Sequence, residues 1–347
     1  MVRSVVGRIL GVVFLFSGFV KCADPVGTSV FVEKYLATYS LDSLLFAALP
    51  IAVLLASVEL TLGVMLLLDR AQRPTAILTT LFMAVFTIIT LLSATVLPIG
   101  HCGCFGDAVK LSPWETLAKN LVMLPMAAYI WWGSAHYVYK RNDLIICILA
   151  LVAALGINLY SLRYQPILDA MPYRVGVNLH DEIRRERQAV EEARSTHLVF
   201  RTAEGEELLF SADDTECWLR DDLEFVESRS EAPASVPQPF AEFIVTSAQG
   251  EECTLDLLAE NSDVLLLTIY DVDALSGRRL KAVRELLDGQ QRVAVLTSAE
   301  ASAITEILGV EPFMLDAMTL RSLIRSRVGV VEINAGVIVR KCDVRDL

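Results

Sequence analysis

The stretch His101-Cys102-Gly103-Cys104-Phe105-Gly106-Asp107 separates two long apolar segments and decides the architecture of the first half of the chain. Pro74–Leu97 precedes it and Trp114–Tyr139 follows it. Each segment exceeds the roughly 20 residues that an α-helix needs to cross a bilayer. We therefore place the two cysteines in a short polar loop at a membrane surface.

Apolar segments of spanning or near-spanning length recur through the first half of the chain. The five predicted spans are Val5–Val20, Leu44–Leu68, Pro74–Leu97, Trp114–Tyr139 and Leu144–Leu162. If they alternate, the basic residues of the short loops share one side, which the positive-inside rule makes cytoplasmic. The amino terminus is then cytoplasmic. The segment Lys21–Ser43, the cysteine loop and everything after Leu162 face outward, into a compartment where disulfides persist.

Composition agrees with an inserted half and a soluble half. The chain has 347 residues, of which 54% are hydrophobic, more than a soluble core of that size needs. Residues 1–165 hold 11 basic and 8 acidic side chains, whereas residues 166–347 hold 19 basic and 34 acidic ones. This acidity argues against a nucleic-acid partner, which needs a basic face. The lipid bilayer is the first partner that the sequence implies.

Cys102 and Cys104 are the candidate catalytic residues. Because one glycine separates them, a bond between them closes a small ring that is strained and easily reduced, which suits electron exchange. A static structural disulfide, a metal clip that includes His101, and unpaired loop residues remain alternatives. A Cu(I) site has no fourth ligand that the sequence identifies, so we predict no metal.

Further residues are candidates for supporting roles. Glu59 and Lys119 lie within predicted spans, where an ion pair between them would offset the cost of burying charge; a protonated Glu59 and a Lys119 that reaches the loop are the alternatives. Lys119 and a protonated His101 would both assist thiolate formation. The remaining supporting candidates are Asp107 in the loop and Cys22, expected on the same outer surface as the loop thiols.

The second half alternates helices and strands. His180–Ser195 predicts a charged helix, and short strands are expected at 198–200, 207–210 and 223–226, so that residues 166–230 form a small β-rich module. The proline-containing segment 231–239 reads as a linker. Residues 240–347 predict an α/β domain. Its expected strands are Phe240–Thr246, Val264–Tyr270, Arg292–Thr297, Val328–Ile333 and Val337–Lys341, and its expected helices are Thr254–Ala259, Ser276–Leu287, Ala299–Leu308 and Thr319–Ser326.

The other cysteines receive structural interpretations first. Cys147 is expected to pack within the fifth span, and Cys342 lies in the closing strand. Cys217 and Cys253 both fall in the periplasmic half, so a disulfide between them stays an open alternative. Seven cysteines in total leave at least one thiol free or paired outside the chain.

The first 160 residues resemble the DoxX-like and MauE-like family of redox-associated bacterial membrane proteins. The matching stretches are Ser17-Gly18-Phe19-Val20-Lys21, Asp24-Pro25-Val26-Gly27, the span around Glu59, Cys102-Gly103-Cys104-Phe105-Gly106-Asp107, Leu111-Ser112-Pro113-Trp114 and Lys119-Asn120. The resemblance implies a four-helix bundle in a bacterial inner membrane. With the fifth span added as an anchor for the tail, the membrane domain covers residues 1–165. It also implies a link to the maturation of disulfide-rich periplasmic enzymes alongside a thioredoxin-like partner.

The tail from Phe240 is similar to the thioredoxin-like fold, most of all to its TlpA and peroxiredoxin relatives, and the whole order resembles a composite protein of Bacteroidetes. The chain has Asp271-Val272-Asp273-Ala274-Leu275-Ser276-Gly277 where active relatives have Cys-x-x-Cys, and Val328 where they have a cis-proline. The resemblance therefore implies the fold without the thioredoxin activity.

These features together predict a membrane thiol–disulfide protein. We expect it to act as a thiol–disulfide oxidoreductase. Cys102 and Cys104 would exchange electrons with a periplasmic client or redox partner, or with a membrane quinone, while the tail docks the partner. The alternative is a non-catalytic membrane scaffold or ligand carrier, in which Cys102–Cys104 is a permanent clasp. The identity of the client, the direction of electron flow, the attacking cysteine and the oligomeric state stay open at this stage.

Overall fold

The computed structural model describes residues 2–96, 102–106, 109–134, 140–194, 196–202, 206–211, 220, 222–230, 239–259, 263–289 and 292–347. Contacts divide the chain into two compact units. The first holds Met1–Arg174 with Arg321–Gly329 and Lys341–Leu347, and the second holds Val175–Leu320 with Val330–Arg340. A helical membrane core combined with a smaller α/β region is the fold class that the sequence predicts.

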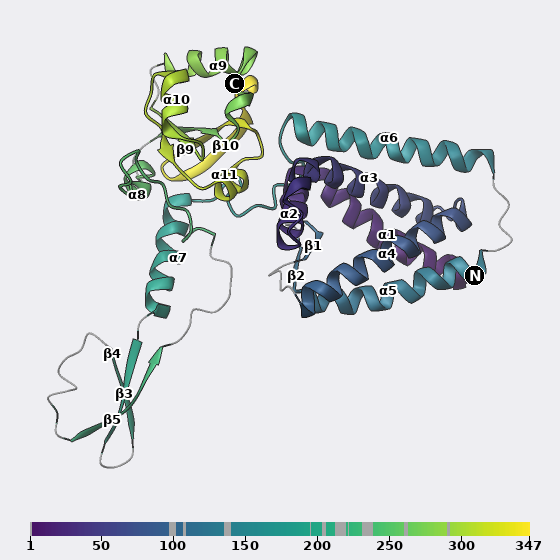
Figure 1. Cartoon of the computed structure of the whole chain (residues 1–347), viewed down its shortest axis with the longest axis horizontal. Coiled ribbons are helices and arrows are strands. Elements are labelled where there is room, and N and C mark those ends of the chain that lie inside the picture. Colours follow the sequence, from purple (N-terminus) through teal and green to yellow (C-terminus); the bar gives the residue numbers. More distant parts are fainter. Residues whose placement is uncertain are drawn as a thin grey trace. The chain divides into compact units, whose positions relative to one another are not determined.

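Long helices dominate the described part of the first unit (Figure 1). They are α1 (Val2–Ala23), α3 (Ala48–Leu67), α4 (Gln72–Thr95), α5 (Pro113–Gly133) and α6 (Arg141–Arg163). Four segments among the described residues are long and apolar enough to cross a membrane, namely Val2–Ala23, Asp42–Leu67, Gln72–Thr95 and Arg141–Arg163. α5 carries Glu115 and Lys119 and is not one of the four, so its span stays a prediction.

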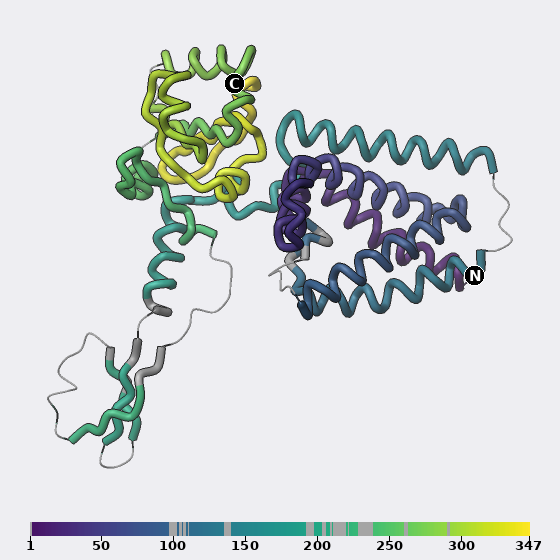
Figure 2. Tube along the Cα trace, viewed as in Figure 1, coloured from purple at the N-terminus to yellow at the C-terminus, as the bar shows by residue number. Residues whose placement is uncertain are grey.

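The helices pack in pairs. α1 lies against α3, α6 covers another side of α3, and α5 contacts both α1 and α4. In Figure 2 α4 and α5 lie side by side. The shared core is apolar and includes Leu10, Phe14, Leu66, Met83 and Ile130. Each helix therefore buries one face and leaves the opposite apolar face available to lipid.

Glycine makes the contact between α1 and α3 unusually close. A Cβ added at Gly18 would lie 2.4 Å from the Leu60 backbone nitrogen, and one added at Gly63 would lie 2.4 Å from that of Leu15. These distances leave no space for even a methyl group, because backbone rather than a movable side chain occupies it. Small residues commonly allow membrane helices to approach in this way.

A further helix lies between the first and second spans. α2 (Pro25–Thr38) begins after Asp24, whose Oδ1 accepts a hydrogen bond from the Gly27 N–H at 2.8 Å, and Pro25 occupies the first helical turn. Both are established signals for a helix start. No helix or strand is predicted within Lys21–Ser43, so α2 is absent from the prediction.

The second unit contains a charged helix and a small antiparallel sheet. α7 (Leu179–Arg194) agrees with the predicted charged helix. The strands β3 (Thr196–Thr202), β4 (Glu207–Ser211) and β5 (Leu223–Ser230) form a sheet in the order β4-β3-β5. Leu198 and Phe200 on the central strand are buried against Phe210 and Leu223. The three strands expected in this region are therefore present.

A five-stranded sheet organises the α/β region. Its order is β10-β9-β6-β7-β8, and both β6 with β7 and β7 with β8 pair in parallel. Its strands are β6 (Val264–Ile269), β7 (Val293–Thr297), β8 (Phe313–Met314), β9 (Val328–Asn334) and β10 (Val337–Asp343), and its helices are α8 (Thr254–Leu257), α9 (Gly277–Leu287), α10 (Ala301–Leu308) and α11 (Ala317–Leu323). Ala335 and Gly336, both with positive φ, form the tight turn between β9 and β10.

Two features of this region differ from the prediction. The expected strand Phe240–Thr246 is absent, because the segment forms turns and only Thr246 pairs, in isolated bridges to Glu252 and Met314. The short strand β8 was not predicted. In both places only one or two residues pair, too few for the hydrophobic pattern of a strand to locate them.

Two segments near the carboxyl end of the chain, Arg321–Gly329 and Lys341–Leu347, belong to the first unit. Asp24, which caps α2, accepts a hydrogen bond from Arg325 Nη2 at 2.8 Å. Arg163, at the end of α6, forms a bidentate ion pair with Asp346, with N–O distances of 2.8 and 2.9 Å. These charged contacts connect residues more than 180 positions apart along the chain.

The close contact of α1 with α3 gives a first prediction. Replacement of Gly63 by alanine should lower the free energy of unfolding by about 2–3 kcal/mol, because the new methyl group meets backbone. Gly156→Ala in α6 is the matched control, since nothing lies within 4 Å of the added Cβ. Thermal unfolding in detergent should show a loss for Gly63→Ala alone. Equal stability of the two variants would contradict the glycine contact.

The number of spans gives a second prediction. If α5 crosses the membrane with the four apolar segments, a reporter fused after Leu347 should be active in the periplasm, while one fused before Met1 should be active in the cytoplasm. Alkaline phosphatase and green fluorescent protein fusions measure this. Activity of both reporters on the same side would show that α5 does not span.

Candidate functional site

A short β-hairpin carries the two loop cysteines. β1 (Cys102–Phe105) pairs antiparallel with β2 (Val109–Leu111), and their register contains an irregularity of the β-bulge type. Gly106 follows β1 with a φ of 55°, and its N–H donates to the Gly103 carbonyl oxygen at 3.1 Å. Gly106 therefore forms a tight bend directly after β1.

Part of the predicted thiol site lies outside the described residues. The structure describes the backbone of Cys102 and Cys104, but not their side chains, and it does not describe His101 or Asp107. The roles predicted for these four residues therefore stay predictions. What the structure does describe is the set of groups that surround the hairpin.

Gly103, between the two cysteines, packs on an aromatic ring of α2. A Cβ added at Gly103 would lie 2.5 Å from Phe31 Cγ and within 2.9 Å of two further atoms of that ring. Only glycine therefore allows the hairpin to approach α2 this closely. The contact holds the Cys-Gly-Cys backbone against the helix bundle.

A buried ion pair joins α1 to α3. Lys21 Nζ lies 2.5 Å from Glu59 Oε2, and it also donates to Ser17 Oγ at 3.0 Å. Lys21 and Glu59 are each only 6% exposed. An unpaired charge in this buried position would be strongly destabilising. Each group therefore offsets the desolvation cost of the other.

The cation that pairs with Glu59 is Lys21, so the predicted Glu59–Lys119 pair is corrected. The predicted first span ends at Val20, whereas α1 continues to Ala23. Its last turn therefore carries Lys21 into the interior of the helix bundle. The close packing at Gly18 then brings this turn against α3. Such a contact depends on helix rotation, which sequence spacing alone does not specify.

Lys119 nevertheless lies near the pair. A small cavity of about 20 Å³ is lined by both partners, Lys21 and Glu59, and by Lys119 and Asn120 of α5. This space is sufficient for about one water molecule, and its walls supply the several polar partners that a buried water needs. Glu59 and Lys119 therefore line one small cavity, together with Lys21, the residue that the prediction lacked.

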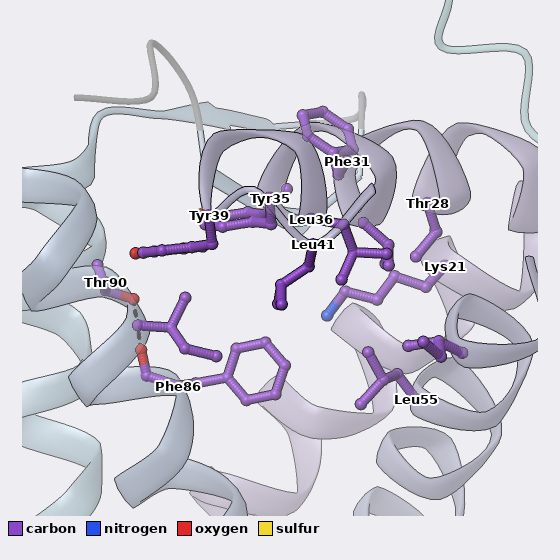
Figure 3. Close-up of a pocket in the computed structure, with 14 residues that line it drawn as sticks. Lys21, Thr28, Phe31, Tyr35, Leu36, Tyr39, Leu41, Leu55, Phe86 and Thr90 are labelled. Carbon is purple, nitrogen blue, oxygen red and sulfur yellow. Dashed lines mark hydrogen bonds between the residues drawn. The ribbon is translucent and has the colours of Figure 1, made fainter. Parts of the chain in front are cut away.

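A larger apolar cavity of about 310 Å³ opens beside the hairpin (Figure 3). Its lining combines aromatic and aliphatic side chains from α2, α3 and α4 with the backbone of Gly103. The residues are Lys21, Thr28, Phe31, Val32, Tyr35, Leu36, Tyr39, Leu41, Ile51, Leu55, Phe86, Ile89, Thr90 and Gly103. In Figure 3 the Lys21 ammonium points into the space between Leu41, Leu55 and Phe86. Its volume falls in the range of small-molecule sites.

Sequence reasoning missed the aromatic wall of this cavity because it missed α2. Phe31, Tyr35 and Tyr39 are spaced by four residues, which places them on one face of a helix. The Asp24-Pro25 helix start, followed by this spacing, is the signal that would have revealed the wall.

Cys22 lies in the last turn of α1, and its side chain is buried in the packing between helices. Its side chain is 0% exposed and packs with Ala56, Leu60 and Ala154. Its sulfur accepts a hydrogen bond from Asn158 Nδ2 at 3.2 Å. Because α1 continues past Val20, Cys22 remains inside the bundle. These contacts favour a packing role over a relay role.

The described cysteines of the second half and of α6 have structural surroundings. Cys253 is a free thiol whose Sγ donates to the Val245 carbonyl oxygen at 3.6 Å, while Cys217 lies outside the described residues. Burial, together with nearby acidic residues, raises the pKa of the Cys253 thiol. Cys147 is half-buried in α6, and Cys342 is buried in β10.

The buried ion pair gives a third prediction. Lys21→Met or Glu59→Leu alone should lower the free energy of unfolding by about 3–5 kcal/mol, because each leaves one buried charge without its partner. The double variant Lys21→Met/Glu59→Leu should recover most of this loss. Thermal unfolding in detergent of the four proteins of this double-mutant cycle measures the coupling.

Lys34→Met in α2 is the control for the ion pair, because Lys34 is exposed and its loss should change stability by no more than about 0.5 kcal/mol. Additive losses in the double variant would show that Lys21 and Glu59 do not stabilise each other.

Comparison with known proteins agrees with this architecture. Residues 1–133 match the family model of the methylamine utilisation protein MauE. Protein TlpB of Flavobacterium psychrophilum is 27% identical over 113 residues, which cover 31% of this chain and 30% of TlpB. The match thus spans less than a third of that relative's length. No solved structure matches the chain. Both likenesses fit a redox-associated membrane protein, and residues 1–133 form a MauE-like membrane region.

Proposed function

We propose that the chain is a thiol–disulfide protein of the bacterial inner membrane that exchanges electrons through Cys102 and Cys104. The electrons pass to or from a periplasmic protein or a membrane quinone. The observation that carries this proposal is the position of the Cys-Gly-Cys backbone on a hairpin, held through Gly103 on Phe31 beside an apolar cavity. A purely structural loop has no need of a ligand-sized cavity at its base.

The spacing of the two cysteines supports exchange over stapling. A disulfide between residues separated by one glycine closes a very short loop, so it contributes little stability through chain entropy. The same short ring strains the bond and makes it easier to reduce. The helix bundle has its own core and does not need this bond to stay folded.

In this proposal the second half serves as a docking region with no thiol chemistry of its own. Asp271 follows β6, and Ser276 caps α9, where an active thioredoxin-like fold would carry its cysteines. Burial, followed by the charges of Asp256, Glu252 and Glu251, raises the pKa of Cys253, which disfavours the reactive thiolate. Residues 166–230 and 240–347, joined by the linker 231–239, would present binding surfaces in the periplasm.

A non-catalytic ligand carrier is the alternative function, and the cavity is the observation that favours it. A carrier needs an apolar site of ligand size, and the cavity of about 310 Å³ meets that need without any thiol chemistry. Cys102–Cys104 would then be a permanent clasp over the site.

The loop thiols give a fourth prediction. Cys102→Ser and Cys104→Ser should both accumulate to normal levels, and one of them should trap a mixed disulfide with a periplasmic protein, because the remaining thiol attacks but has no neighbour to resolve the bond. Non-reducing electrophoresis followed by mass spectrometry of the adduct should locate the bond at the remaining loop cysteine.

Cys147→Ser is the matched control and should give no adduct, since it leaves both loop thiols in place. The clasp alternative expects no adduct from either loop variant and a lower protein level from both. Normal levels of both variants without any adduct would refute the exchange and clasp functions together.

A further inference from the structure

We infer that the apolar cavity beside the hairpin is a quinone site at which the Cys102–Cys104 dithiol is reoxidised. This inference rests on the proposed function and names its electron acceptor. Gly103 contributes to the cavity wall, and the two cysteines are its immediate neighbours in the chain. A ligand in the cavity therefore lies beside the segment that carries both thiols.

The shape and lining of the cavity suit a flat, ring-shaped headgroup. Phe31 and Tyr35 from α2, with Tyr39 directly after it, lie on one side, and Phe86 from α4 lies on the other (Figure 3). Aromatic side chains stack favourably on a planar conjugated ring. The remaining aliphatic wall would accompany the start of an isoprenoid tail toward lipid.

Two polar groups distinguish a quinone from a plain hydrocarbon chain. Lys21 Nζ uses two of its three N–H bonds on Ser17 and Glu59 among the described residues, which leaves one for a ligand in the cavity. The Tyr39 hydroxyl is buried and has no hydrogen-bond partner in the described part of the chain. A quinone carbonyl oxygen accepts hydrogen bonds from such donors, whereas a lipid acyl chain would leave both without an acceptor.

Glu59 offsets the cost of placing the Lys21 ammonium group at this depth. The carboxylate neutralises the ammonium from the side of α3, so that an N–H donor can face an apolar cavity at tolerable cost. The ion pair thus positions a donor for the carbonyl oxygen of the ligand. In this scheme Lys21 binds the quinone, and Glu59 is the positioning residue that holds Lys21 in place.

The reaction balances without a further reagent. The thiols of Cys102 and Cys104 lose two electrons and two protons, their two S–H bonds break, and one S–S bond forms. The quinone takes up both electrons and both protons on its two carbonyl oxygens and leaves as the quinol. A periplasmic protein whose own thiols become oxidised then reduces the loop disulfide for the next cycle.

The test uses the full chain in nanodiscs of dioleoylphosphatidylcholine, with decylubiquinone as oxidant and an azido-ubiquinone as photolabel. Reduced protein should yield one quinol for each Cys102–Cys104 disulfide formed, and the photolabel should attach within α2. Leu55→Trp, which fills the cavity, should lower both the reaction rate and the labelling by on the order of tenfold.

Matched variants separate the cavity from general effects of substitution. Leu54→Trp changes the neighbouring residue, which is 62% exposed and faces away from the cavity, and it should behave as the parent chain. Tyr39→Phe removes one hydroxyl and should weaken quinone binding by about fivefold, the effect of one hydrogen bond. The double variant Cys102→Ser/Cys104→Ser should still bind the photolabel but form no quinol.

The outcomes distinguish this inference from the proposed function. Equal labelling of the Leu54→Trp and Leu55→Trp variants would show that quinone only partitions into lipid, and would overturn the inference. Mixed disulfides from the loop variants without quinol formation would overturn the quinone site but leave thiol exchange in place. If the photolabel attaches but the loop thiols stay reduced and form no adduct, both the quinone site and the proposed thiol exchange would be overturned.

Discussion

The buried pair of Lys21 and Glu59 is the interaction on which the membrane region depends. Neither charge is stable alone inside a helix bundle, so α1 and α3 must rotate until the two groups meet. The glycines at the α1–α3 contact make this geometry accessible, because Gly18 lies one turn before Lys21 and admits the backbone of α3. The ion pair and the glycine contact therefore specify the same arrangement of two helices, one through charge and the other through shape.

The same arrangement prepares the region around the hairpin. Lys21 lines both the small cavity beside Glu59 and the large apolar cavity beside the hairpin. Phe31 receives Gly103 on one side and contributes to the large cavity, so the Cys-Gly-Cys backbone and a ligand-sized space share a boundary. A membrane thiol pair needs a partner that accepts or supplies two electrons, and the cavity provides space for one that is soluble in lipid. In the proposed function the second half contributes a binding surface, because its two described thiols are unfavourable for exchange: Cys342 is buried and the pKa of Cys253 is raised.

The regular elements could be predicted from sequence where local patterning determines them. The apolar spans, the charged helix α7, the three strands of the small sheet and the Ala335-Gly336 turn all follow from periodicity and turn chemistry. The pairing of Glu59 could not be predicted, because it depends on where α1 ends and how it rotates against α3. α2 was predictable from the capping residues Asp24 and Pro25 but was missed, and with it the aromatic wall of the cavity. The expected strand Phe240–Thr246 is absent, because Thr246 alone pairs, in isolated bridges to Glu252 and Met314, and one paired residue is too little for a hydrophobic pattern to predict.

The redox state of Cys102 and Cys104 in living cells tests the central claim most directly. Thiol trapping with a mass-shifting maleimide, followed by mass spectrometry, reports the oxidised fraction of the pair in cells with respiratory quinone and in cells depleted of it. The account predicts a largely oxidised pair when quinone is present and a shift toward the reduced dithiol when it is absent, with Cys147 unchanged as an internal reference. A pair that stays fully oxidised, or fully reduced, under both conditions would contradict it.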